Sequence, residues 1–103
     1  MKIITAENFK SEVESFDGLS VIDLYADWCG PCRMLAPILE QLEGEYPEVN
    51  FCKINVDEQP ELAKEFNVSS IPMVAFVKGD MFIDLHVGLA PKRVLQEKIE
   101  ANK

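Results

Sequence analysis

The sequence predicts an α/β fold in which one mixed central β-sheet of about five strands is flanked by four helices. Three observations carry this prediction. An apolar, β-branched run at residues 19–25 has the length and character of a strand that is buried on both faces. Apolar residues at helical spacing follow it between residues 34 and 46. Two more strand-like runs flank the turn Lys78-Gly79-Asp80, which indicates an antiparallel hairpin.

The first half of the chain should contain two strands and two helices. In order, these are a short strand at 3–5, a helix that ends at Phe16, the buried strand at 19–25 and a long helix at 29–45. Thr5 or Asn8 is the expected cap of the first helix, because both side chains accept hydrogen bonds from helix N–H groups. Pro37 lies inside the second helix and should kink it, because proline has no N–H to donate.

The second half should contain three strands and two helices. The expected elements are a strand at 50–56, a short helix entered at 57–60, strands at 73–77 and 81–87, and a terminal helix at 91–101. A loop at 67–72 precedes the hairpin, and Gly88 ends it. Since strands alternate with helices along most of the chain, we expect helices on both faces of the sheet.

The composition indicates one domain, residues 1–103, with enough apolar residues for a core. The hydrophobic content is 48% and the formal net charge is −8. This negative charge opposes binding to nucleic acids and anionic lipids and disfavours self-association, so we expect a monomer with neither kind of partner. The N-terminus lacks an apolar stretch of signal-peptide length, and the run at 71–77 is too short to cross a bilayer. We therefore expect a cytoplasmic protein.

The cysteine pair at the start of the long helix is the candidate chemical centre. Cys29 and Cys32 are three residues apart and lie on the same face of a helix that begins there, within reach of a disulfide. Pro31 suits a first helical turn, and Gly30 should leave the first sulfur uncovered. The helix N-terminus favours a thiolate at Cys29, whereas Cys32 lies one turn deeper. We therefore expect Cys29 to attack and Cys32 to resolve.

A metal site is the main alternative for such a pair. Zinc usually takes four ligands, and only Cys52 and His86 remain, each inside a predicted strand. A close pair of cysteines in a reducing compartment, with an odd total of three, is more typical of redox chemistry, so we expect no metal. Cys52 is interpreted as a small buried hydrophobic residue and His86 as a surface residue.

Three further residues are candidates for the same site. Asp23 lies among apolar neighbours in the strand that leads to the cysteines, so its carboxyl should be buried, its pKa raised, and its task proton exchange with Cys32. Lys53 is either an ordinary exposed lysine or a neighbour of Asp23 that tempers this rise. Trp28 is either a core residue or an apolar contact surface for a partner, and the second reading is favoured beside an exposed sulfur.

The segment Trp28-Cys29-Gly30-Pro31-Cys32 resembles the active-site motif of the thioredoxin family, and the resemblance extends nearly from end to end. The supporting matches are Asp23 with the family's buried carboxylate, Lys53 with its charged neighbour, Pro37 with the helix kink, Ile71-Pro72 with the loop whose proline is cis, and Val87-Gly88 with the glycine turn of the substrate groove. Tyr25, Met73 and the turn at 78–80 depart from the common pattern. None of them is expected to touch the thiols, so we expect them to bear on partner preference rather than on the chemistry.

The resemblance implies a thioredoxin fold and a general protein disulfide reductase, which is recharged by an NADPH-dependent thioredoxin reductase. Such a protein is a redox carrier rather than a conventional enzyme for one substrate, and it needs no bound cofactor. Disulfide-containing proteins would dock on a flat apolar patch and pair with the backbone beside Pro72. The patch is expected to consist of Trp28, Gly30, Pro31, Ile71, Pro72 and Gly88.

Two other functions use the same fold. An oxidase or isomerase of a secretory compartment is disfavoured by the absence of a signal peptide and by the Gly30-Pro31 dipeptide. A redox-inert binding module would tolerate the loss of both thiols.

Overall fold

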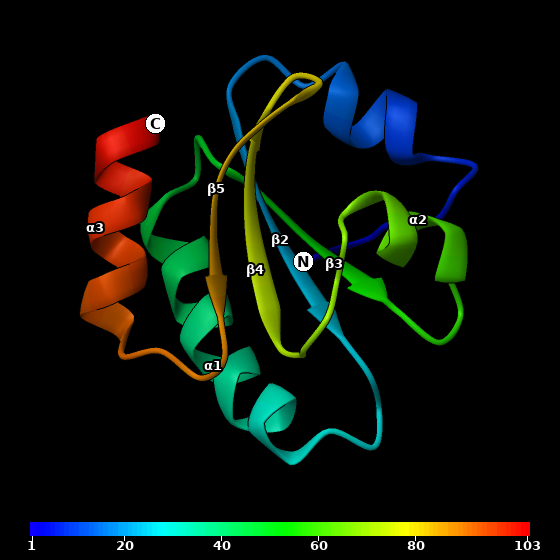
Figure 1. Cartoon of the computed structure of the whole chain (residues 1–103). Helices are drawn as coiled ribbons and strands as arrows, with labels where there is room; N and C mark the ends of the chain where they lie inside the picture. The colour runs from blue at the N-terminus through cyan, green and yellow to red at the C-terminus, as the bar shows by residue number, and fades with distance from the viewer.

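The computed structural model describes all residues from Met1 to Lys103 and contains one five-stranded sheet. The strands are β1 (Lys2–Ile3), β2 (Leu19–Tyr25), β3 (Asn50–Asn55), β4 (Met73–Lys78) and β5 (Met81–Val87). They lie in the order β1-β3-β2-β4-β5 (Figure 1). β1, β3 and β2 are parallel, whereas β4 runs antiparallel to β2 and β5 antiparallel to β4. The predicted mixed sheet is confirmed.

Helices cover both faces of this sheet, as the alternating element order predicted. They are η1 (Lys10–Glu14), α1 (Gly30–Glu45), α2 (Pro60–Glu65) and α3 (Lys92–Asn102). α1 and α3 pack on one face and contribute Leu35, Leu39, Leu95 and other residues to the first core cluster. η1 and α2 contribute to a second cluster on the other face. None of the helices combines the length and apolar character needed to cross a membrane.

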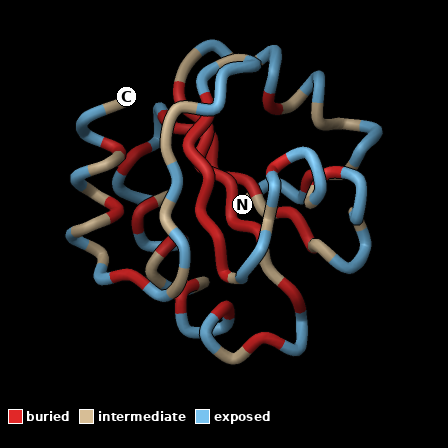
Figure 2. The backbone as a smooth tube through the Cα atoms, viewed as in Figure 1, coloured by how far each residue is buried: buried red, intermediate tan, exposed pale blue.

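The central strands are buried because their side chains alternate between the two clusters. Val21 of β2 points into the first cluster and Ile22 into the second, and Phe76 and Val77 of β4 divide in the same way. Figure 2 shows these strands as buried along most of their length, whereas β5 at the edge of the sheet is only partly covered. The buried run at 19–25 was therefore read correctly from its apolar character.

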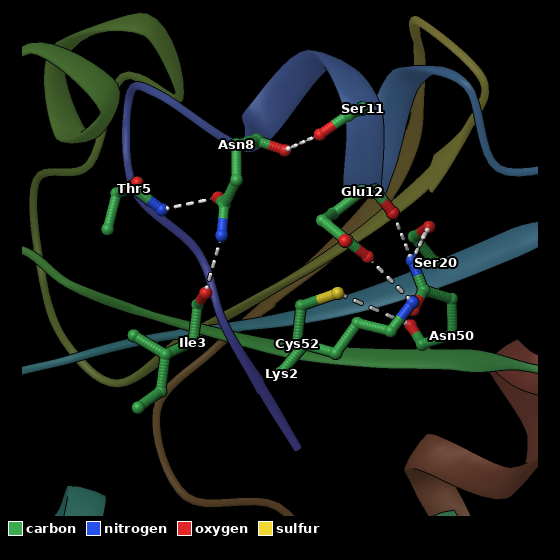
Figure 3. A network of polar contacts seen from close by, with 9 residues as sticks. All are labelled: Lys2, Ile3, Thr5, Asn8, Ser11, Glu12, Ser20, Asn50 and Cys52. Atoms are coloured by element: carbon green, nitrogen blue, oxygen red, sulfur yellow. Dashed lines mark hydrogen bonds and ion pairs between the residues drawn. The ribbon is translucent and has the colours of Figure 1, made fainter.

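The first helix differs from the prediction, because it is a five-residue π-helix and has no side-chain cap. Asn8 instead accepts a hydrogen bond from the Thr5 N–H at 2.8 Å and donates one to the Ile3 carbonyl at 3.0 Å, which fixes the preceding turn (Figure 3). The Asn50 amide donates to the Glu12 carbonyl at 2.8 Å. The expected cap at Thr5 or Asn8 is wrong, since these side-chain contacts hold the segment from outside the helix.

The long helix α1 begins at Gly30, one residue later than expected, so Cys29 is its N-cap. Pro31 lies in the first turn, and Pro37 lies in the interior without ending the helix, which continues to Glu45. The kink expected at Pro37 stays a prediction. Because Cys29 caps α1, the cysteine pair lies at the end of the sheet where β2 and β3 end.

Candidate active site

The two cysteines of the motif meet in a disulfide at the N-terminus of α1. Cys29 has an extended backbone and Cys32 lies in the first helical turn, with 5.2 Å between their Cα atoms. The Cys32 N–H donates to the Cys29 sulfur at 3.2 Å. A sulfur at this position accepts one of the N–H groups that a helix leaves unpaired at its start, and the helix dipole stabilises negative charge there. This environment favours the thiolate form of Cys29 when the bond is reduced.

Cys29 was expected to be more exposed than Cys32, and this prediction is wrong for the disulfide form. Cys29 is 4% exposed and Cys32 is 3% exposed. Both belong to a small cluster with Ala26, and Tyr25, Val56 and Ile71 pack against it. Tyr25, which was not expected to touch the thiols, therefore lies against their cluster. Because the two residues are almost equally buried, what distinguishes them is the position of Cys29 at the helix terminus, not exposure.

Asp23 and Lys53 are brought together below the cysteine pair, since they are paired neighbours on β2 and β3. Asp23 is buried, and its Oδ1 atom has no hydrogen-bond partner. Burial raises the pKa of Asp23 to about 7, and the positive charge of Lys53 partly offsets this rise. Lys53 is half-buried, with its Nζ 5.8 Å from the centre of the Tyr25 ring. The expected raised pKa and the expected tempering by Lys53 are both found.

A pocket of about 220 Å³ connects these two residues with Cys32. Its lining also includes Arg33, whose guanidinium donates to the Asp27 carbonyl at 2.8 Å. A carboxyl whose pKa lies near neutrality exchanges protons readily at physiological pH. Asp23, whose pKa lies near neutrality, therefore lines the same pocket as the second thiol.

Trp28 lies at the surface, as the favoured reading predicted, with 69% of the residue exposed. Its indole N–H donates to the Asp57 carboxylate at 2.8 Å. The sequence indicated Asp57 only as part of the helix entry at 57–60, so its contact with the indole was missed. The topology could have predicted this contact. Residues that follow the parallel strands β2 and β3 lie at the same end of the sheet.

The loop before β4 forms the other side of the site. The Ile71–Pro72 bond is cis, as the family resemblance implied. Ile71 packs against the cysteine cluster, and the Gly88 N–H donates to the Pro72 carbonyl at 2.8 Å. Gly88 has a φ of 92°, which favours glycine at this position. This hydrogen bond thus links the cis-proline loop to the turn after β5.

The expected apolar patch is only partly a surface. Trp28 and Pro31 are exposed, and Gly30, Ile71 and Gly88 are half-buried. Pro72 is buried, so its contribution is to shape the backbone rather than to present a side chain.

Neither Cys52 nor His86 lines the pocket beside Cys32. Cys52 is fully buried in the second core cluster, where burial raises the pKa of its thiol to about 12. Its S–H contacts the Asn50 carbonyl at 3.8 Å (Figure 3). His86 is half-buried on β5, with Nε2 unpaired. Cys52 is therefore a core residue, as expected, whereas His86 is less exposed than a surface residue should be. No group of three or more potential ligands is placed to hold a metal ion.

Comparisons with known proteins agree with this geometry. The family model described as Thioredoxin matches residues 1–101. The chain is 46% identical to a thioredoxin of Chlamydia pneumoniae over 99 residues, which cover 96% of this chain and 95% of that protein. It is 38% identical to thioredoxin 2 of Chlorobaculum tepidum over 97 residues, which cover 93% and 89%.

Solved structures match the whole architecture as well. The X-ray structure of Fasciola hepatica thioredoxin superposes with a TM-score of 0.92 at 37% identity and covers 100% of both chains. The oxidized form of mitochondrial thioredoxin 3 from Saccharomyces cerevisiae gives a TM-score of 0.88 at 35% identity, with 98% of this chain and 94% of that chain covered. With its two cysteines bonded at the start of α1, this protein is a dithiol–disulfide reductase. Sequence, fold and cysteine geometry agree, and the chain belongs to the thioredoxin family.

Proposed function

We propose that this chain reduces disulfide bonds in other proteins, with Cys29 as nucleophile and Cys32 as resolving thiol, and that an NADPH-dependent thioredoxin reductase returns it to the dithiol state. The observation that carries the assignment is the N-cap position of Cys29, whose sulfur accepts the Cys32 N–H. A helix N-terminus stabilises a thiolate, and the thiolate is the attacking species in disulfide exchange.

The reaction proceeds in two exchanges. The Cys29 thiolate attacks one sulfur of the substrate disulfide, which forms a mixed disulfide and releases the other substrate sulfur as a thiolate. Cys32 then gives its proton to Asp23 across the shared pocket, and its thiolate attacks the Cys29 sulfur of the mixed disulfide. The Cys29–Cys32 disulfide forms, and the second substrate sulfur leaves and takes up a proton. Lys53 moderates the pKa of Asp23 in this cycle.

Substrates dock on the surface around the disulfide. The exposed faces of Trp28 and Pro31 offer apolar contact, and the half-buried Gly30, Ile71 and Gly88 allow a close backbone approach. The backbone beside Pro72 pairs with an extended substrate segment, in the manner of strand addition. Disulfide-containing proteins are thus recognised by main-chain pairing more than by side-chain sequence.

The chain works as a monomeric, single-domain redox carrier in the cytoplasm, without a nucleic-acid or membrane partner. The net charge of −8 supports this proposal, because it repels other copies of the chain and polyanions alike.

Reduction of insulin by dithiothreitol tests the function. Wild-type protein should accelerate insulin precipitation, Cys29→Ser should abolish the acceleration, and Cys52→Ser should retain it, because Cys52 lies in the core away from the site. Reduction should also proceed with NADPH and a thioredoxin reductase in place of dithiothreitol. No acceleration by the wild type would favour a redox-inert module, and faster oxidation of reduced peptides than reduction of insulin would favour an oxidase.

A further inference from the structure

The second face of the sheet carries an uncovered apolar groove beside β5. Eight large hydrophobic residues of the chain are exposed, and four of them lie on β5: Met81, Phe82, Leu85 and Val87. Phe82, Leu85 and Val87 pair with Val77, Ala75 and Met73, which belong to the second core cluster. Their side chains therefore face the side of η1 and α2, where Figure 1 shows no helix over β5.

The groove consists of two adjoining hollows with a shared wall. One has a volume of about 470 Å³ and reaches from Phe66 to Leu85 and Val87. The other has a volume of about 180 Å³ and extends toward Phe9 and Val77. Glu65, Phe66 and Phe82 line both, and the rings of Phe66 and Phe82 lie 5.9 Å apart. We call this surface the β5–α2 groove.

The charges at its rim have one sign. Glu14, Glu65 and Asp80 line the groove, and no lysine, arginine or histidine does. These three carboxylates take part in none of the ion pairs of the structure, although other acidic residues do. An apolar floor with unpaired acidic groups at its rim is complementary to an apolar segment that carries basic residues.

We propose that the β5–α2 groove is a docking site for a partner protein's apolar segment with lysine or arginine at the end that enters the smaller hollow, near Glu14, Glu65 and Asp80, and that this binding does not require the thiols. A second copy of the chain is the less favourable occupant, because each copy has a net charge of −8 and would bring its own acidic rim to the contact. The groove begins at Met73 and Val87, the neighbours of Pro72 and Gly88, and leads away from the disulfide along β5. A bound partner thus leaves the cysteine pair accessible.

The partner segment binds mainly through side-chain contacts rather than by adding a strand to the sheet. Asp84 accepts a hydrogen bond from the Leu85 N–H at 2.8 Å, which blocks one donor on the open edge of β5. Phe82, Leu85 and Val87 are each between 43% and 47% exposed, so they can bury further apolar area on binding. Leu85 is the central anchor because it lies between the other two.

The test is titration of the full chain with a fluorescent, cysteine-free peptide that has a segment of leucine, valine and phenylalanine followed by lysines at one end. Binding should weaken at least about tenfold in Leu85→Lys, in keeping with the loss of a central apolar anchor. Ile3→Lys is the matched control, since Ile3 is an exposed apolar residue on β1 at the opposite edge of the sheet. Glu65→Lys should weaken binding, whereas Glu97→Lys, with the same charge change on α3, should not. Added salt should weaken the wild-type complex.

Amide resonances of β5 and α2 should shift on binding. Insulin reduction by Leu85→Lys should equal that of the wild type, so a failure of the docking proposal can be told apart from a failure of the reductase function. Equal binding of a peptide with glutamates in place of the lysines would overturn the proposal. So would binding that Leu85→Lys and Glu65→Lys leave unchanged. A dimer in sedimentation that Leu85→Lys dissociates would identify a second copy as the occupant and would also overturn it.

Discussion

Only Cys29 caps the helix, and on this ground Cys29 is the proposed nucleophile and Cys32 the proposed resolving thiol. Cys32→Ser should therefore accumulate mixed disulfides with cell proteins, since Cys29 still attacks and no thiol resolves the product. Non-reducing gels of lysate should show adducts that dithiothreitol removes. Cys29→Ser should show none, and the double variant serves as the blank. Adducts with Cys29→Ser alone would reverse the assignment.

Asp23 should destabilise the fold at neutral pH. Its pKa is raised from 3.8 to about 7, so the folded state binds more protons than the unfolded state between these values. Stability is therefore lost as pH rises through this range, and above about pH 7 the cost is complete. At about 1.4 kcal/mol for each pH unit, the cost is at most about 4 kcal/mol. Asp23→Ala should accordingly be more stable than the wild type at pH 8, with little gain at pH 4.

Urea melts at the two pH values measure this gain, and insulin reduction should slow in the same variant because Cys32 loses its proton acceptor. Asp27→Ala is the matched control, since Asp27 lines the same pocket but is exposed. An Asp23→Ala variant less stable than the wild type at pH 8 would show that the Asp23 carboxyl is solvated. Unchanged turnover would mean that another group accepts the proton of Cys32.

At the scale of single elements, the central strands were predictable because their apolar pattern depends on the sheet alone. The first strand was placed wrongly, since it was expected at residues 3–5 and β1 spans Lys2–Ile3. β2 was read to the residue, since every side chain from Leu19 to Leu24 is buried. The π-helical turn at Lys10–Glu14 was not predictable, because the Asn50 amide that contacts the Glu12 carbonyl comes from a strand 38 residues away in sequence. The sequence pattern of η1 describes its buried face but not its hydrogen bonding.

The link between Trp28 and Asp57 joins two loops, and it provides a direct test. Trp28 is the only tryptophan of the chain, so its fluorescence reports on this loop alone. Asp57→Ala removes the acceptor of the indole N–H, so tryptophan anisotropy should fall as the ring gains freedom. If the ring orients substrates, KM for insulin should rise a few-fold with little change in kcat. Glu58→Ala is the control, and unchanged anisotropy in Asp57→Ala would show that the bond does not restrain the ring.

At the scale of the whole molecule, the fold was predictable but several of its surfaces were not. The order of elements implied one sheet with helices on both faces, and the sheet indeed separates two core clusters. The packing of Ile71 against the cysteine cluster and the β5–α2 groove both depend on how loops and helices lie across strands distant in sequence. Alternation along β5 predicts which side chains share a face, whereas the position of α2 decides whether that face is covered.

The two clusters should nevertheless unfold as one unit, because β2 and β4 contribute to both. Leu39 lies in the first cluster and Ile54 in the second, and each is fully buried. Leu39→Ala and Ile54→Ala should each lower the free energy of unfolding by about 2–5 kcal/mol, since each leaves a cavity that its neighbours fill only in part. Met34→Ala is the control on the exposed side of α1 and should change it by less than about 0.5 kcal/mol. Far-ultraviolet circular dichroism and Trp28 fluorescence should give coincident denaturation curves for all variants. Separate midpoints in Leu39→Ala or Ile54→Ala would mean that the Trp28 loop melts apart from the secondary structure, so that the chain does not unfold as one unit.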